Sequence, residues 1–274
     1  MALIENNVRF GAASEFSGYQ VLPPAKPSDL PLPAVLLIQE AWGVDSHIRS
    51  VARRLAAAGY AVLAPDLFAK DGRRLPGLEA EAMEAAKNWM ETLPAGAWQD
   101  PAKRAEILAS AGEEGRRAAA TLEKLFGGLQ SNRDYHLQVL LAGAQYLETG
   151  IPEAKGGKMA SLGFCMGGSL SAELATRLPR LSGAVLFYGS SPERGRLSLV
   201  SCPVLGFYGG TDARVNAGIP AFEQGMREEG KRLEVHILKG AGHAFLNETR
   251  ASFHPAAART AWARMLGFLN EALA

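Results

Sequence analysis

Residues 158–168 read Lys-Met-Ala-Ser-Leu-Gly-Phe-Cys-Met-Gly-Gly, a short apolar run that meets a cysteine framed by glycines. The run 158–162 predicts a buried strand, and a helical pattern at 167–178 follows it. The Gly-x-Cys-x-Gly spacing matches the sharp strand-to-helix turn that presents a nucleophile, with Cys165 in place of the usual serine. In such a turn the N–H of Met166 faces a developing oxyanion, and the helix N-terminus favours a thiolate. The segment therefore predicts an α/β sheet that carries a cysteine nucleophile.

Apolar runs of the same kind alternate with helical patterns along the chain. Strands are expected at 33–39, 60–64, 158–162, 183–187, 203–207 and 233–238. Helices are expected at 46–58, 136–148, 167–178, 217–229 and 256–272. This alternation predicts βαβ units and a mainly parallel, doubly wound sheet flanked by helices, in one α/β domain over residues 1–274.

One segment, residues 77–128, interrupts this alternation because it contains no strand-like run. Helical patterns at 78–93, 101–111 and 113–126 predict a helical insertion instead. Two interpretations stay open. The insertion either crosses over one face of the sheet, or it forms a lid that shapes the entrance to an active site.

Two later loops supply the partners that a cysteine nucleophile requires. Asp212 ends the sequence Gly209-Gly-Thr-Asp after one predicted strand, and His243 lies in a glycine-rich loop after another. Because the carboxyl ends of parallel strands meet at one edge of a sheet, both side chains should lie beside Cys165. Asp212 would then fix the tautomer of the imidazole, and His243 would transfer the proton.

Composition excludes several other classes of protein. The 29 Lys plus Arg balance 28 Asp plus Glu, which disfavours a nucleic-acid partner. Apolar runs are far shorter than a membrane span requires, and two cysteines make no disulfide framework, so a cytoplasmic protein is expected. No metal-ligand spacing or nucleotide-binding glycine motif occurs, so no cofactor is expected. Five side chains are interpreted as structural or solvated: Cys202, His47, His136, His236 and His254.

Five motifs together resemble the dienelactone hydrolase family, the carboxymethylenebutenolidases. They are Gln39-Glu-Ala-Trp-Gly-Val44, Ala64-Pro-Asp-Leu-Phe68, Gly163–Gly168, Gly209–Asp212 and Gly240–Phe245. The resemblance covers roughly 33–70 and 130–270. It implies an α/β-hydrolase fold, a Cys165–His243–Asp212 triad, no cofactor, and a small-molecule ester, lactone or thioester as substrate.

The resemblance also implies roles for the loop that begins at Glu40. In the family, the glutamate at this position meets the nucleophile's thiol in the resting enzyme, and substrate binding changes that contact. The N–H of Ala41 would join that of Met166 as the oxyanion hole. Close to these motifs, three side chains are expected to bind substrate: Trp42, Phe245 and Asn247.

The chain departs from the family where its members hold a substrate carboxylate with arginines. The matching positions here carry Asn247 and, on an approximate match, Ala82; Arg250, Arg73 and Arg74 are candidate replacements. The sequence thus predicts a cysteine-dependent hydrolase that works through an acyl-enzyme. Two alternatives remain: a non-catalytic binding protein with this fold, and an acyltransferase that uses the same triad with an alcohol or amine in place of water.

Overall fold

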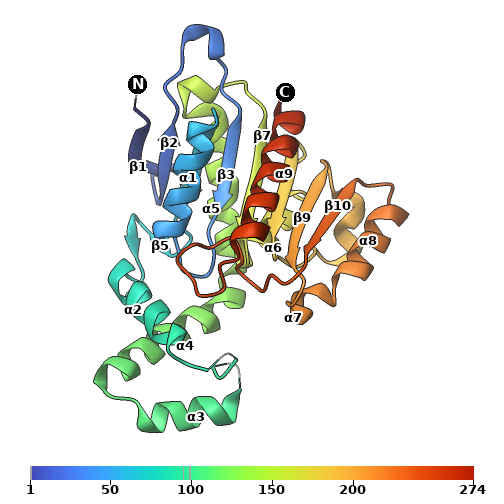
Figure 1. Cartoon of the computed structure of the whole chain (residues 1–274). Coiled ribbons are helices and arrows are strands. Elements are labelled where there is room, and N and C mark those ends of the chain that lie inside the picture. The colour runs from blue at the N-terminus through green and yellow to red at the C-terminus, as the bar shows by residue number, and fades with distance from the viewer. Residues whose placement is uncertain (1, 95, 99) are drawn as a thin grey trace.

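The computed structural model describes residues 2–94, 96–98 and 100–274, so residues 95 and 99 of the predicted insertion lie outside the described residues (Figure 1). Over the described ranges, eight strands form one sheet in the order β1-β2-β4-β3-β7-β8-β9-β10. Their bounds are β1 Ile4–Phe10, β2 Phe16–Leu22, β3 Ala34–Ile38, β4 Ala61–Pro65, β7 Met159–Phe164, β8 Gly183–Phe187, β9 Val204–Gly209 and β10 Leu233–Leu238. The strands from β4 to β10 pair in parallel, which confirms the predicted mainly parallel sheet.

The antiparallel hairpin of β1 and β2 has no counterpart among the expected strands. β1 is exposed over most of its length and reads Ile-Glu-Asn-Asn-Val-Arg-Phe, so it lacks the apolar run that marks an interior strand. β2 is buried and pairs antiparallel with both β1 and β4. A second small ribbon, of β5 (Ala69–Lys70) and β6 (Arg73–Arg74), leads from β4 toward the insertion.

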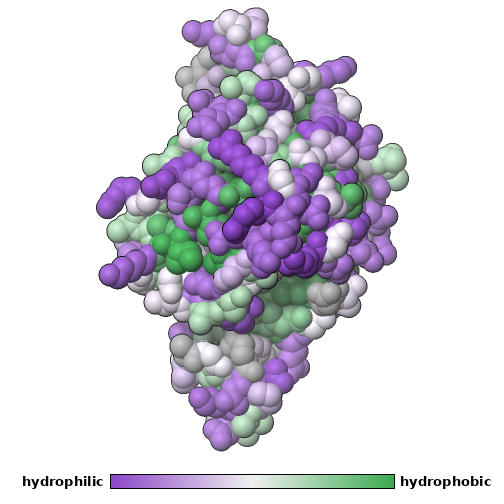
Figure 2. All heavy atoms as spheres, turned by 90° about the vertical axis from the view of Figure 1, so that its right-hand side faces the viewer, coloured by the Kyte–Doolittle hydropathy of each residue, from purple (hydrophilic) through white to green (hydrophobic). Residues whose placement is uncertain are grey.

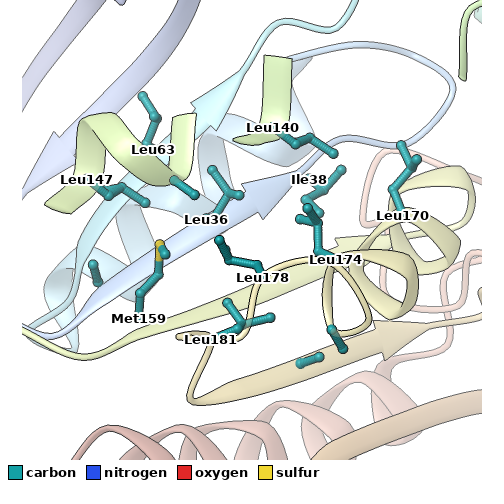
Figure 3. Packing of buried hydrophobic residues seen from close by; sticks show 14 of the residues in the cluster. Leu36, Ile38, Leu63, Leu140, Leu147, Met159, Leu170, Leu174, Leu178 and Leu181 are labelled. Atoms are coloured by element: carbon teal, nitrogen blue, oxygen red, sulfur yellow. The ribbon is translucent and has the colours of Figure 1, made fainter. Parts of the chain in front are cut away.

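Helices cover both faces of the sheet, as Figure 1 shows. One face carries α1 (Ser46–Ala57) and α9 (Pro255–Leu273), and the other carries α5 (Arg133–Thr149), α6 (Met166–Leu174) and α8 (Ile219–Glu228). Side chains alternate along β3, so Val35 and Leu37 pack toward α1 while Leu36 and Ile38 pack toward α5 and α6 (Figure 3). All four are fully buried, so apolar packing on both faces of the sheet holds the carboxyl end of the strand in place.

Outside the predicted insertion, the other helical segments among the described residues are short: α7 (Ala213–Asn216) and the 3₁₀ turns η1 (Pro27–Asp29), η2 (Pro152–Ala154) and η3 (Arg194–Leu199). None of the helices in the described ranges has the length and apolar character needed to cross a membrane.

The predicted insertion contains three helices, α2 (Ala80–Glu91), α3 (Pro101–Ser110) and α4 (Glu113–Ser131). They lie beyond the carboxyl edge of the sheet, with α2 packed on α4, and form the narrow extension at the bottom of Figures 1 and 2. α3 has no buried residue among those described. The insertion therefore adds a layer at the edge of the sheet where the predicted site residues lie, and does not cover a sheet face.

A buried ion pair ties α2 to the start of α1. The Nζ atom of Lys87 lies 2.9 Å from Oδ2 of Asp45, and Lys87 is only 1 % exposed. The other carboxylate oxygen of Asp45 accepts the N–H of Ile48 at 3.1 Å and caps α1. One carboxylate thus joins the insertion to a helix that packs on the sheet.

Candidate active site

Cys165 sits in the turn between β7 and α6, as the sequence predicts. Its backbone is strained, with φ 53° and ψ −114°, a region that non-glycine residues rarely adopt. The flanking glycines are required by close approach: a Cβ on Gly163 would lie 2.0 Å from the carbonyl oxygen of Gly167, and one on Gly167 would lie 2.4 Å from that of Gln39. The turn is anchored by the N–H of Cys165, which donates to the carbonyl of Phe187 at 2.9 Å.

His243 and Asp212 meet at the same edge of the sheet. The Nδ1 atom of His243 lies 2.5 Å from Oδ2 of Asp212, which leaves Nε2 as the nitrogen for proton transfer. Asp212 is nearly buried and directly precedes α7, and its Oδ1 accepts the N–H of Val215 at 3.4 Å. His243 follows β10 and precedes Ala244, which has a positive φ of 59°. The structure therefore brings Cys165, His243 and Asp212 together as one cluster.

The charges in this cluster favour a protonated imidazole. Burial alone would lower the pKa of His243, but the hydrogen bond to Asp212, followed by the hydrogen bond and charge of Cys165, raises this pKa to about 10. For Asp212, burial would raise the pKa, yet the hydrogen bond to His243 and its positive charge lower it. Each partner thus stabilises the charged form of the other.

Glu40 follows β3 and is 3 % exposed. The hydroxyl of Tyr188 donates to its Oε1 at 2.9 Å, and the amide Nδ2 of Asn247 donates to its Oε2 at 2.7 Å. Within the described residues, these are the hydrogen bonds of the carboxylate, and none joins it to Cys165. This arrangement differs from the contact with the resting thiol that the resemblance implies.

The two N–H groups expected to bind an oxyanion lie at the ends of neighbouring strands. Met166 opens α6, and the first N–H groups of a helix have no acceptor within it. Ala41 lies in a turn closed by the N–H of Gly43, which donates to the carbonyl of Glu40 at 3.3 Å. Ala41 lines the cavity described next.

A cavity of about 590 Å³ lies over Cys165 and His243. Its floor comes from the sheet edge, including Glu40 and Ala41, and much of its wall comes from the insertion. The lining contains three large aromatic side chains, Trp42, Trp98 and Phe126, together with smaller apolar residues. Trp42 and Trp98 belong to the hydrophobic cluster of the insertion, so the same packing that holds α2 and α4 shapes the cavity.

The charged side chains of the cavity wall are largely paired. Arg250 forms an ion pair with Glu91, and its guanidinium lies 5.1 Å from the ring centroid of Trp42. The second lining cation, Arg214, belongs to α7 and is exposed, and its charge acts on Asp212. Arg250 thus already has a carboxylate partner, Arg214 remains an exposed cation of the lining, and the rest of the wall is mainly apolar.

Of the three side chains expected to bind substrate, one lines the cavity and two do not. Trp42 lines the cavity. Phe245 and Asn247 are fully buried and are absent from its described lining, because the loop after His243 folds back into the core. The expected direct contact of Phe245 and Asn247 with substrate therefore does not fit their positions.

The candidate replacement arginines and the other residues named from the sequence also lie partly inside and partly outside the cavity lining. Of the arginines, Arg250 lines the cavity, whereas Arg74 pairs with Asp66 at 2.7 Å outside its described lining. Ala82 lines a separate groove between α2 and α4.

The other histidines are held in structural contacts away from the cavity: His47 with Glu248, His136 against Phe68, His236 with Glu234, and His254 at the start of α9. Among the described residues, no group of three or more His, Cys, Asp or Glu is arranged to hold a metal ion.

Sequence reasoning missed Tyr188, the residue that directly follows β8. Its side chain is 1 % exposed, its φ is 43°, and its ring centroid lies 5.0 Å from that of His243. Burial, then the neighbouring Glu40, raises its pKa well above the usual value, so the hydroxyl keeps its proton and donates. Its place after a parallel strand, at the edge that carries Cys165 and His243, is the signal that marks it.

Comparison with known proteins matches the sequence to one family. The family model described as "Dienelactone hydrolase family" matches residues 16–273. A protein of Saccharolobus solfataricus named "Putative carboxymethylenebutenolidase" is 33 % identical over 240 residues, which cover 87 % of this chain and 89 % of the relative. A protein of Escherichia coli K12 with the same name is 28 % identical over 257 residues, covering 90 % and 79 %.

Solved structures show the same fold. A crystal structure of a "Putative Dienelactone Hydrolase" from Klebsiella pneumoniae superposes with a TM-score of 0.68 over 98 % of this chain and 99 % of that chain, at 24 % identity. The fold is thus the α/β-hydrolase fold, and the family model spans nearly all of the residues that build it. By sequence and by fold, the chain belongs to the dienelactone hydrolase family.

Proposed function

We propose that this protein hydrolyses a small carboxylic ester or lactone through an acyl-enzyme on Cys165. Family membership makes an ester or lactone hydrolase the expected activity. The observation that carries the finer proposal is the cluster of a strained Cys165 in the β7–α6 turn beside the His243–Asp212 pair. The same cluster speaks against a purely binding role, since it assembles a nucleophile, a base and an orienting carboxylate.

The reaction runs in two halves. The Cys165 sulfur, with its proton on Nε2 of His243, attacks the carbonyl carbon, and the N–H groups of Met166 and Ala41 stabilise the oxyanion by about 3 kcal/mol each. His243 then gives its proton to the leaving oxygen, and a thioester remains on Cys165. Water, deprotonated by His243, attacks this thioester, and the acid leaves as the sulfur regains its resting state.

The cavity lining supports a substrate with a bulky, uncharged group. Trp42, Trp98 and Phe126 offer aromatic surface, and Arg250 is already neutralised by Glu91. A substrate carboxylate that approached Arg250 would have to compete with Glu91 for the guanidinium, which leaves the exposed Arg214 as the other lining cation. An aryl or alkyl ester therefore fits the wall better than a dicarboxylate.

The test combines turnover with detection of the acyl-enzyme. Using p-nitrophenyl esters of graded size and matched esters that carry a carboxylate, Cys165→Ala should abolish turnover, while Cys202→Ser should leave it intact. Mass spectrometry of the wild-type protein, quenched with acid during turnover of the best p-nitrophenyl ester, should show an acyl group on the peptide that contains Cys165. Wild-type turnover by Cys165→Ala, or acylation elsewhere, would refute the mechanism, and preference for the charged esters would refute the assigned substrate polarity.

A further inference from the structure

Glu91 stands where the helix that carries it gains nothing from its charge. It is the last residue of α2, and the helix dipole disfavours a carboxylate at that end. Its contacts lie instead in the loop between His243 and α9. Its Oε1 forms an ion pair with the guanidinium of Arg250, and its Oε2 accepts the N–H of Ala251 at 3.3 Å. Glu91 therefore ties the insertion to the loop that follows the candidate base.

Packing holds the guanidinium of Arg250 in the cavity wall. It lies 5.1 Å from the ring centroid of Trp42, and the arginine side chain is only 15 % exposed. A cation that is stacked on an aromatic ring and largely buried keeps its place and is weakly screened by salt. If Glu91 lost its charge, this guanidinium would remain beside the cavity as an uncompensated cation.

The balance of charge around the cavity depends on this pair. Two carboxylates and two guanidinium groups line it, namely Glu40, Glu91, Arg214 and Arg250. Glu40 is 3 % exposed and has a hydrogen-bond donor on each of its oxygens, so it is already engaged. Arg214 is exposed, so water screens its charge. Glu91 and Arg250 are therefore the charges that a bound molecule meets at close range.

We propose that Glu91 determines the charge of the substrate: it occupies the Arg250 guanidinium and so excludes esters that carry a carboxylate. This inference rests on the proposed function, because it concerns the selectivity of the same cavity. A substrate carboxylate meets Glu91 in two ways, as a competitor for Arg250 and as a like charge. An uncharged ester meets neither obstacle. Selectivity then comes from rejection of the wrong substrate as well as from contact with the right one.

The experiment compares a charged ester with its neutral form. The p-nitrophenyl half-ester of adipic acid carries a carboxylate, and its methyl ester has nearly the same shape without the charge. A second pair places the carboxylate on the leaving aryl group. The selectivity ratio is kcat/KM for the charged ester divided by kcat/KM for its neutral form, so a general loss of activity cancels.

The isosteric variant Glu91→Gln keeps an oxygen for the N–H of Ala251 but loses the charge. It should raise the selectivity ratio by roughly tenfold for at least one pair of esters, through a lower KM for the charged ester. Glu81→Gln removes an exposed carboxylate from the first turn of the same helix and should leave the ratio unchanged.

Two further substitutions identify the cation that Glu91 occupies. Arg250→Gln leaves Glu91 uncompensated, so it should lower the selectivity ratio by roughly tenfold. The double variant Glu91→Gln with Arg250→Gln should return the ratio to nearly the wild-type value. The gain from Glu91→Gln should persist when Arg214→Gln is added, because Arg214 lies outside the ion pair.

A binding measurement separates this inference from the proposed function. In a Cys165→Ala background, calorimetry with phenylacetate and phenylacetamide reports the same selectivity without turnover. Glu91→Gln should tighten binding of the acid relative to the amide by roughly tenfold, and about 0.5 M NaCl should weaken that gain. Turnover that survives Cys165→Ala would refute the proposed mechanism and leave this binding result standing.

Three outcomes would each overturn the inference. The first is an unchanged selectivity in Glu91→Gln, both in turnover and in binding. The second is a gain that persists with Arg250→Gln and disappears with Arg214→Gln, which would assign the cation to α7. The third is an equal gain from Glu81→Gln, which would show that the total charge of the insertion acts and that the contact with Arg250 does not.

Discussion

The carboxyl edge of the sheet and the inserted helices build opposite sides of one cavity by different means. At the sheet edge, Glu40, Cys165 and Asp212 lie within three residues of the ends of strands whose residues are all buried. In the insertion, α3 buries none of its described residues, and the aromatic wall is held by one small hydrophobic cluster. The candidate catalytic residues thus stand on the part of the molecule with the larger core, and the aromatic wall of the cavity stands on the part with the smaller core.

The largest effect should come from removing the base at the sheet edge. His243→Asn should lower kcat by about 10⁴-fold without unfolding the protein, because proton transfer is lost while the core is untouched. The matched variant His236→Asn, on the outer part of β10 beside Glu234, should keep wild-type turnover. Steady-state kinetics with a p-nitrophenyl ester checks both, and equal losses in the two variants would contradict the assignment of His243.

Truncating a buried side chain in the sheet core should produce the next largest effect, a loss of folding stability. Leu36 is fully buried between α5 and the sheet, so Leu36→Ala should lower the free energy of unfolding by about 2–5 kcal/mol. Leu199→Ala, at a site 54 % exposed, should change it by less than about 0.5 kcal/mol. Urea denaturation measures both, and similar values would show that the sheet core does not dominate stability.

The junction between the two regions should respond to acid through His136. Burial, then the charge of Arg133, lowers its folded-state pKa to about 4, whereas the unfolded-state value is about 6.5. The unfolded chain therefore binds the proton first, and stability is full above about pH 6.5 and falls as the pH drops toward 4. The expected loss is about 3 kcal/mol by pH 4.

The check is denaturation at several pH values. The His136→Gln variant should lose this part of the acid sensitivity, although it has its own packing cost at neutral pH. If both proteins lose stability in parallel between about pH 6.5 and 4, His136 is not the group responsible.

A smaller effect should follow removal of the aromatic wall. Trp98→Ala should raise KM for an aryl ester by roughly tenfold and change kcat by less than about threefold, because the lost contact lies away from the reacting carbonyl. Trp262→Ala, where Arg54 stacks 3.5 Å from the ring on α9, is the control remote from the cavity. A loss in kcat with an unchanged KM would mean that Trp98 acts on the chemical step, and it would contradict the assignment of the chemical step to the sheet edge alone.

The smallest effect should be found at the start of α3. Asp100 caps this helix through the N–H groups of Ala102 and Lys103, at 3.0 and 3.3 Å. Because α3 buries none of its described residues, Asp100→Ala should lower the global free energy of unfolding by less than about 1 kcal/mol. The matched cap variant Asp45→Ala should cost about 3 kcal/mol, since it leaves the buried Lys87 with only the half-exposed Glu84, 3.6 Å away, as a partner. Equal costs would mean that α3 is as cooperative with the core as α1.

The same division explains how far sequence could predict the molecule. The interior strands and the Cys165 turn are encoded locally, by apolar runs and by glycines that only close backbone approach requires. Asp212 and His243 could be placed because the ends of parallel strands share one edge. β1 could not, because its exposed residues carry no apolar run and its pairing depends on β2.

The wall of the cavity and the shell behind Glu40 depend on distant contacts. Arg250 follows His243 closely in sequence, but its partner Glu91 comes from α2, so its neutralisation could not be read from either segment. Asn247 stands where the family resemblance points to substrate, yet its side chain turns inward to Glu40. Tyr188 and Asn247 converge there from different loops, and only the packed structure reveals that meeting.

The two bonds of Asp45 also have a mechanical consequence. Its carboxylate caps α1, which begins a few residues after the Glu40–Gly43 turn, and it holds Lys87 of α2. A bound molecule that pushes α2 outward must therefore either break a buried ion pair or pull on the first turn of α1. Ala41 lies within the Glu40–Gly43 turn, shortly before Asp45 in the chain, so the Asp45–Lys87 pair links the cavity wall to the segment that carries the candidate oxyanion donor.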